Sequence, residues 1–402
     1  MRKRDIGILG GAVVLRLLVF YLFPGAVDFL TTQVEISTPV TSFKRLQEGL
    51  FLYERGVSPY DGGLFHQAPL LLVILGIFPA PLIFTALDLI NAWSLKFIAD
   101  SLKLSSPRFK PIDGTIIAAA FLFNPFTILS CLGRSTSLFM NLAIIQAVLS
   151  ATTGNVAQSM IALAFGGYLT MYPVLLLPPI LILLHQSAAP GTSRTQTALA
   201  GLGWFAVSLI AFLSSTLLIT GDMWEFIRSC YGFQLTVPDL TPNVGLWWYF
   251  FIEIFDSFRD FFVGVFWLHM AGYVGGLTLR LQKEPLFVII SLLGIFAVFK
   301  PYPSIADVSL YLGFLPMYQH ILPLTRYTFI AASVLLYTSL LGPAFHYLWI
   351  YAGSGNANFF YAITLVWSLG LAILIGDTLF AVLRDEWEVE RPDMKGKDVR
   401  RI

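Results

Sequence analysis

The chain has 402 residues, of which 56% are hydrophobic and only 12% are charged. Soluble domains carry roughly 25% charged residues, so this composition excludes an ordinary soluble enzyme and indicates a polytopic membrane protein. The formal net charge of +1 gives no sign of a nucleic-acid partner. The two cysteines, Cys131 and Cys230, form no CxxC pair and are predicted to be buried apolar residues.

We predict an all-helical chain with about twelve transmembrane spans, because a span needs roughly 20 predominantly apolar residues. The first has a basic start but no clean small-residue cleavage site, so we interpret it as a retained span. The apolar run 69–79 is too short to span and is predicted to be re-entrant or interfacial. The expected spans are 6–24, 80–102, 112–130, 135–152, 156–170, 171–187, 199–220, 259–280, 285–300, 304–320, 323–350 and 357–382.

Basic residues in the short loops predict the orientation, since cytosolic loops carry an excess of Lys and Arg. The basic N-terminus, the loops near 101–111 and 278–284, and the charged tail 383–402 all fall on the cytosolic side. Both termini are therefore expected in the cytosol. Residues 25–68 and 221–258 are expected to form lumenal loops of a single membrane domain, 1–402.

Both lumenal loops are predicted to contain interfacial helices. In "TSFKRLQEGLFLYERG", Phe43, Leu46, Leu50 and Tyr53 recur at helical spacing with charged residues between them, which is typical of an amphipathic helix lying on a membrane. The second loop carries "GLWWYFFIEIF", whose aromatic residues suit a membrane interface.

The sequence carries no HExxH motif, P-loop or Rossmann glycine pattern, and its histidines show no paired metal spacing, so no cofactor or metal is expected. Three charges within the spans, at Arg16, Lys96 and Asp113, are near span ends and are expected to snorkel. Asp377 lies deeper, in "LAILIGDTLFAVL", and is predicted to make a buried polar contact with another helix. The remaining charges within spans are Asp88, Arg134 and Arg326.

The stretch "VSPYDGGLFHQAPLL", residues 57–71, combines turn residues with an apolar run. Pro59 and Pro69 fix the backbone, and the two glycines between them allow a tight turn. We interpret it as a structural cap on the lumenal side, with His66 hydrogen-bonded. A lone histidine at a membrane edge is more often structural than a ligand.

A second distinctive stretch is "YAGSGNANFFYAITL", residues 351–365. Gly353 and Gly355 prevent a regular helix and end the preceding span. Asn356 can cap the helix that follows, but capping does not explain Asn358 or the aromatic run behind it. The two amides together with a helix N-terminus could bind phosphate and sugar hydroxyls.

The stretches "GVSPYDGGLFHQAPLL", "FNPFTILSC", "LWIYAGSGNANFFYAITL" and "GDTLFAVLRDE" resemble the PIG-U family over nearly the whole chain. The resemblance implies a non-catalytic subunit of the GPI transamidase in the endoplasmic reticulum membrane, which helps to recognise the GPI lipid. It implies that the cleaving cysteine belongs to PIG-K and that the other partners are PIG-T, PIG-S and GPAA1. On this basis, Asn356 and Asn358 are expected to contact the GPI headgroup, and Phe359 and Tyr361 to border its lipid.

The PIG-U family is also distantly similar to GT-C mannosyltransferases such as PIG-M, which use an acidic residue, commonly one of a pair, on the first lumenal loop. The matching stretch "TTQVEISTP" has Glu35, but Gln33 takes the paired position. This weakens a catalytic role, and we interpret Glu35 as a solvated or hydrogen-bonded loop carboxylate. The alternatives are a dolichol-phosphate-mannose-dependent mannosyltransferase of GPI synthesis, a transporter, and an assembly subunit without ligand contact.

Overall fold

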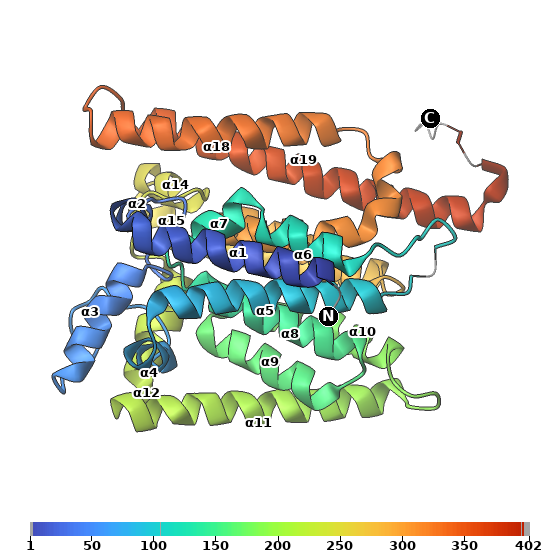
Figure 1. The fold of residues 1–402 in the computed structure, drawn as a ribbon, viewed down its shortest axis with the longest axis horizontal. Helices are drawn as coiled ribbons and strands as arrows, with labels where there is room; N and C mark the ends of the chain where they lie inside the picture. The colour runs from blue at the N-terminus through green and yellow to red at the C-terminus, as the bar shows by residue number, and fades with distance from the viewer. Residues whose placement is uncertain (1–2, 105, 395, 398–402) are drawn as a thin grey trace.

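The computed structural model describes residues 3–104, 106–394 and 396–397, and this part of the chain is helical, without strands. The longest apolar helices lie roughly side by side along the long axis of the molecule (Figure 1). These six helices are long and apolar enough to cross a membrane. They are α1 (Lys3–Leu22), α5 (Ala80–Ser101), α11 (Arg194–Thr220), α15 (Asp256–Arg280), α18 (Thr328–Ile350) and α19 (Ala357–Glu390).

The expected count of about twelve spans is not confirmed. Helices α6 (Gly114–Leu122) and α7 (Pro125–Leu132) bend by 54° where they join, and counting this pair as one span gives up to seven. The other apolar helices of the described chain are shorter. A helix of 15 residues extends only about 22 Å, less than the roughly 30 Å hydrocarbon core. They are α8 (Ser137–Thr152), α9 (Val156–Leu169), η1 (Tyr172–Leu176) with α10 (Leu177–Gln186), α16 (Pro285–Phe299), and α17 (Ile305–Phe314) with η3 (Leu315–Leu324).

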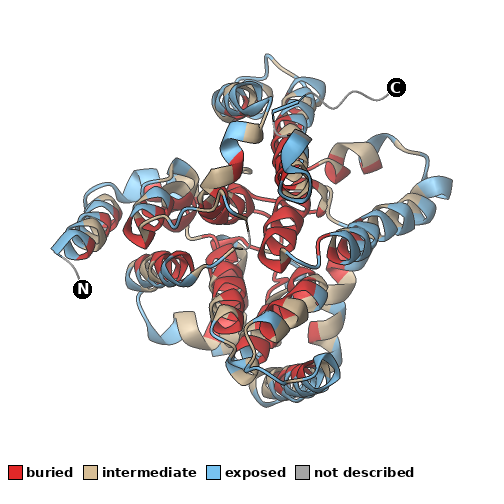
Figure 2. Ribbon diagram, turned by 90° about the vertical axis from the view of Figure 1, so that its right-hand side faces the viewer, coloured by how far each residue is buried: buried red, intermediate tan, exposed pale blue. Residues whose placement is uncertain are grey.

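The shorter helices lie inside the bundle. Side chains of α16 are buried nearly all around its axis, which explains why its sequence is uniformly apolar and not amphipathic. Figure 2 shows the buried residues concentrated on central helices, with exposed faces on the outside. The bundle therefore has an interior layer of short helices surrounded by longer ones.

The buried pair of Arg16 and Asp88 corrects the expectation that Arg16 snorkels. The Arg16 side chain is fully buried, its Nε donates to Asp88 Oδ2 at 2.8 Å, and its Nη2 donates to the carbonyl of Leu122 at 2.9 Å. Leu122 is the last residue of α6, where carbonyls lack helical partners. Arg16 is thus paired in the interior and satisfies the backbone at the break before α7.

One end of the bundle carries most of the connecting segments, and we call it the loop-rich end, formed by residues 23–79, 221–255 and 351–356 (Figure 1). The amphipathic helix predicted in the first segment is present as α3. The run expected to be re-entrant or interfacial forms only the eight residues of α4. The helices here are α2 (Pro24–Leu30), α3 (Phe43–Glu54), α4 (Leu70–Ile77), α12 (Met223–Phe226), η2 (Ile227–Gly232), α13 (Phe233–Thr236) and α14 (Trp247–Glu253).

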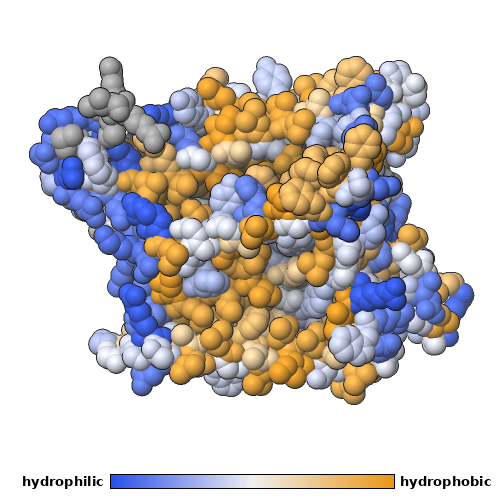
Figure 3. All heavy atoms as spheres, turned by 180° about the vertical axis from the view of Figure 1, so that it is seen from behind, coloured by the Kyte–Doolittle hydropathy of each residue, from blue (hydrophilic) through white to orange (hydrophobic). Residues whose placement is uncertain are grey.

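At the opposite end, α19 continues to Glu390 and is followed by the short turn η4 (Pro392–Met394), so the first residues of the expected tail are helical. Arg108, in the loop between α5 and α6, binds Asp385 and Glu388 of this extension. Figure 3 shows hydrophobic side chains over the middle of the molecule and hydrophilic ones gathered toward its two ends. That distribution is expected of a molecule whose middle faces lipid.

Candidate functional site

The turn between α18 and α19 presents both candidate asparagines at the loop-rich end. As predicted, the preceding helix stops at Ile350 and Asn356 caps α19, its side-chain oxygen accepting from the backbone N–H of Phe359 at 3.3 Å. Gly353 adopts a left-handed φ of 62°. A Cβ on Gly355 would lie only 3.2 Å from the backbone nitrogen of Trp349, so close backbone packing favours glycine there.

Asn358 and Tyr361 join this turn to α14. The Asn358 side-chain oxygen accepts a hydrogen bond from the Tyr249 hydroxyl, and the Tyr361 hydroxyl donates to the Leu246 carbonyl at 3.1 Å. Both asparagines are exposed, which leaves their amide nitrogens at the molecular surface. The structure therefore gathers the predicted asparagines at one exposed helix N-terminus, with Tyr361 directly behind them.

Aromatic rings form a platform behind the asparagines. Trp248 of α14 is buried and packs against Trp349, Phe360 and Tyr361, with ring centroids 5.6–6.1 Å apart. Phe359 instead points outward, is 53% exposed, and stacks on a neighbouring ring of α18. Sequence reasoning identified Phe359 and Tyr361 but not Trp248, which it assigned only to a membrane interface.

His66 lies in a different part of the loop-rich end. Its Nδ1 is 2.9 Å from the Ser229 carbonyl oxygen, and its ring stacks on Phe233 with centroids 3.6 Å apart. Burial lowers the pKa of His66, because the charged form loses its hydration. The stacked and hydrogen-bonded imidazole joins the segment between α3 and α4 to η2 and α13, which is a structural arrangement.

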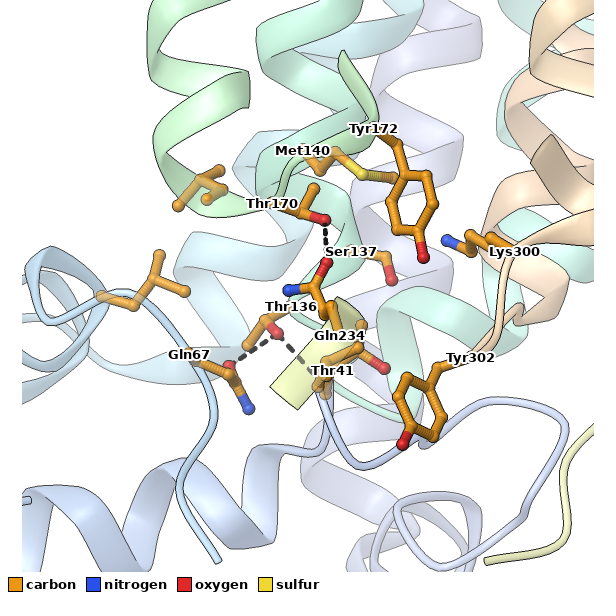
Figure 4. A pocket seen from close by; sticks show the side chains of 13 residues that line it. Thr41, Gln67, Thr136, Ser137, Met140, Thr170, Tyr172, Gln234, Lys300 and Tyr302 are labelled. Carbon is orange, nitrogen blue, oxygen red and sulfur yellow. Dashed lines mark hydrogen bonds between the residues drawn. The ribbon is translucent and has the colours of Figure 1, made fainter. Parts of the chain in front are cut away.

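A small polar cavity of about 40 Å³ is lined by Gln67, the residue that follows this histidine in the chain (Figure 4). Gln67 accepts from the Thr136 hydroxyl at 2.7 Å, and Gln234 accepts from the Thr170 hydroxyl at 2.7 Å. These pairs join both loop segments to the ends of α8 and α9. The cavity has room for about one water molecule. Sequence reasoning missed Gln67, although it stands next to His66 in the same stretch.

Lys300 lies at the wall of this cavity, where Figure 4 shows its amine near the Tyr172 hydroxyl. Its Nζ lies 2.5 Å from Asp307 Oδ1, and both side chains are buried. Asp307 also accepts from the backbone N–H of Ser304, at the start of α17. The charge of Lys300 is therefore neutralised within the chain, and this cavity is electrically neutral.

Glu35 is half-buried in the segment between α2 and α3, and within the described part of the chain one of its two carboxylate oxygens is without a hydrogen-bond partner. That oxygen, Oε1, is buried, and burial raises the pKa of Glu35 to about 7. The nearby Gln33 donates to the carbonyl of Phe29 at 3.2 Å. The amide of Gln33, which stands where a second acidic residue would be, therefore hydrogen-bonds to the backbone of α2.

Asp377 holds the start of α18. Its carboxylate accepts hydrogen bonds from the backbone N–H of Arg326, at 2.8 and 3.0 Å, and of Tyr327, at 2.7 Å. It thus lies against the connection from η3 to α18 and away from the asparagines. Cys131 and Cys230 are buried and unbridged, as predicted.

Long apolar helices, a hydrophobic middle and a polar loop-rich end define a multi-pass membrane protein. Residues 10–367 match the family described as GPI transamidase subunit PIG-U, and the chain belongs to that family. It is 37% identical over 390 residues to the GPI transamidase component GAB1 of Saccharomyces cerevisiae, with 96% of each chain covered. It is 36% identical over 391 residues to the GPI-anchor transamidase component PIGU of Homo sapiens, covering 90% of this chain and 89% of that one.

Proposed function

We propose that this chain is a non-catalytic subunit of the GPI transamidase in the endoplasmic reticulum membrane. It holds the GPI lipid while the anchor is attached to the C-terminus of a proprotein. Membership of the PIG-U family supports the assignment to the complex. The observation that supports lipid binding is the exposure of Asn356 and Asn358 at the N-terminus of α19, beside an aromatic platform.

The chemistry of this helix end suits a phosphorylated glycan. Unpaired N–H groups and the helix dipole favour an anion at a helix N-terminus, and the two amides add donors and acceptors. Phe359, exposed on the outer face, and Tyr361, behind the asparagines, border the acyl chains. Holding the acceptor amine beside an acyl-enzyme on another subunit accelerates the transfer by proximity.

The topology that we propose keeps the loop-rich end in the lumen and both termini in the cytosol. The start of α1 and the end of α19 both point away from the loop-rich end (Figure 1), which supports an even number of crossings. Twelve crossings in a GT-C-like arrangement follow if the shorter interior helices also cross. PIG-K, with the catalytic cysteine, PIG-T, PIG-S and GPAA1 are the proposed partners.

The test separates lipid contact from helix capping. Asn356→Ser keeps a capping oxygen but loses the amide, so the double variant Asn356→Ser, Asn358→Ala preserves α19 and removes both amides. In cells lacking the native chain, it should assemble with the other subunits and lower the rate of GPI attachment about tenfold or more. The control variant is Asn155→Ser, because Asn155 is an exposed asparagine elsewhere in the chain. The buried Asn243 would not be a matched control. Normal attachment by an assembled double variant would show that the asparagines do not hold the headgroup.

A further inference from the structure

Two neighbouring cavities lie around the turn between α15 and α16, at the end of the bundle opposite the loop-rich end. The first, of about 210 Å³, is bordered by this turn, η3 and the last part of α19. The second, of about 400 Å³, is bordered by the turn, the end of α10 and the loop after α5. Lys283, Glu284 and Tyr318 line both cavities, so the two adjoin. The second is within the range of roughly 300–1,000 Å³ that is typical of ligand pockets.

The two cavities differ in charge. Four carboxylates and one lysine line the first, namely Glu284, Asp385, Glu386, Glu390 and Lys283. The second has a further lysine, Lys103, and five apolar side chains, Leu102, Leu104, Leu183, Pro285 and Leu286. An acidic cavity beside a basic and apolar one is complementary to a molecule that carries a cation, an anion and an apolar chain in that order.

The ion pair between Lys283 and Glu390 is the one that a ligand can most readily open. Arginines hold two of the other carboxylates, Asp385 by Arg108 and Glu386 by Arg280. The Lys283 Nζ lies 3.3 Å from Glu390 Oε1, and the two side chains are 71% and 59% exposed. Exposed ion pairs of this kind contribute little to stability. Lys283 and Glu390 can therefore exchange each other for the anion and the cation of a ligand.

A ring nitrogen of His320 points to a polar occupant of the first cavity. Its Nδ1 is buried and, within the described residues, has no hydrogen-bond partner. The ring lines the first cavity and contacts Phe109 and Tyr318, with centroids 5.6 Å apart in each pair. More than about 90% of buried polar groups in proteins have a partner. The cavity beside the ring is where a partner for this nitrogen can lie.

The first cavity lies at the level where the sequence of α19 changes from apolar to charged. Val382, the last residue of the span expected at 357–382, lines it, and charged residues follow from Arg384. Leu281 and Ile321 in the same lining are also buried and apolar. Hydrophobic side chains cover the middle of the molecule and hydrophilic ones gather toward its ends (Figure 3). Lipid headgroups occupy the boundary between such regions.

We propose that the two cavities bind the headgroup of a zwitterionic phospholipid that carries a primary amine. Its ammonium group donates hydrogen bonds to Glu390 and to His320 Nδ1 in the first cavity. Its phosphate accepts from Lys283 and Lys103 in the second, whose apolar side chains contact the acyl chains. The ion pair inside the chain is thereby replaced by charge-assisted hydrogen bonds to the ligand. A basic peptide would leave the lysines without an anion, and a purely anionic lipid would leave Glu390 without a cation.

The experiment uses the intact complex in detergent, with the native chain replaced by wild type or a variant. Two photoreactive lipids are compared, phosphatidylethanolamine and phosphatidylcholine, each with a diazirine at the start of one acyl chain. Labelled peptides are identified by mass spectrometry. In wild type, phosphatidylethanolamine should label residues 102–104 or 281–286 at a concentration about tenfold lower than phosphatidylcholine, because a trimethylated ammonium cannot donate N–H groups to Glu390.

Two variants test the contacts. Glu390→Gln should abolish the preference between the two lipids. Val389→Trp, which fills the exposed side of the first cavity, should raise the concentration of phosphatidylethanolamine needed for labelling about tenfold. Val366→Trp is the matched control, because Val366 is a valine of α19 with similar exposure, 40% against 43%, and lines neither cavity.

Equal labelling by the two lipids in wild type, or a preference that survives in Glu390→Gln, would show that the cavities do not select the amine and would overturn the proposal. Absence of label from both segments would overturn it as well. If Glu390→Gln does not assemble, equal labelling of Val389→Trp and Val366→Trp would place the lipid elsewhere. None of these results bears on the proposed GPI contact, since Asn356 and Asn358 lie at the opposite end.

Discussion

The carboxylate of Asp377 on α19 accepts a 2.7 Å hydrogen bond from the backbone N–H of Tyr327, the residue immediately before α18. It also accepts from the preceding N–H, of Arg326. Asp377 therefore acts as the N-terminal cap of a helix to which it does not belong. The cap ties the two helices of the hairpin together at the end opposite their connecting turn.

Replacing Asp377 should loosen this hairpin. Asp377→Ala leaves two backbone N–H groups without their acceptor, and each such loss costs about 1–3 kcal/mol. Asp377→Asn keeps one acceptor oxygen and should cost less. The thermal midpoint of the detergent-solubilised protein should be lower for Asp377→Asn than for wild type, and lower still for Asp377→Ala. The exposed Asp260→Ala should leave the midpoint unchanged. Equal midpoints for Asp377→Ala and wild type would contradict the capping role.

The two glycines of the turn between α18 and α19 should tolerate alanine much less well than a glycine inside α19. Gly353→Ala forces a side chain into the left-handed region, and Gly355→Ala places a Cβ against the backbone of Trp349. Each should destabilise the turn by about 1 kcal/mol or more. Gly376→Ala, in α19 with open space around it, should be neutral or slightly stabilising. Thermal midpoints of the three variants measure the difference, and a loss at Gly376 equal to that at Gly355 would oppose it.

Acidification should destabilise the His66 contact. Because the folded-state pKa of His66 is below its ordinary value of 6.5, its neutral form contributes stability above pH 6.5 that is lost as the pH falls toward the folded pKa. His66→Phe keeps the stacking on Phe233 but removes the titrating group. Its thermal midpoint should fall less than that of wild type between pH 7 and pH 5. Parallel curves would show that folding does not shift the pKa of His66.

Glu35 should have the opposite pH dependence. Its folded-state pKa of about 7 exceeds the ordinary 4.5, so the stability that it contributes is complete below pH 4.5 and is lost as the pH rises through 7. In lipid-free preparations, Glu35→Gln should therefore raise the thermal midpoint at pH 8 and have little effect at pH 4.5. No gain at pH 8 would mean that the carboxylate is already compensated.

Much of the helical content could be predicted from hydropathy, and the break at Gly353 and Gly355 from local rules alone. The number of crossings could not, because hydropathy does not distinguish a helix that faces lipid from α16, which is equally apolar and wholly inside the bundle. Burial depends on which segments pack together. The same limit explains the error at Arg16, since its environment is made by Asp88, a residue more than 70 positions away.

Lys300 and Gln67 illustrate a second limit. Each carries an ordinary polar side chain in an apolar or turn-rich context, with no motif around it. Their roles arise only where the ends of several helices meet the two loop segments. By contrast, Asn356 could be predicted as a cap because a cap is decided by the three residues that follow it.

The break between α6 and α7 has a genetic consequence. Arg16 is needed in the interior because the interrupted helix leaves the Leu122 carbonyl without a helical partner, and Asp88 is needed because Arg16 is there. A change that straightened the helix, such as replacing both Asn124 and Pro125, would let the Phe126 N–H, which here donates to Asn124 Oδ1, bond that carbonyl instead. Second-site mutations that suppress a defective Arg16 variant should then arise at the bend and at Asp88. These positions are far apart in sequence, but both are in contact with Arg16.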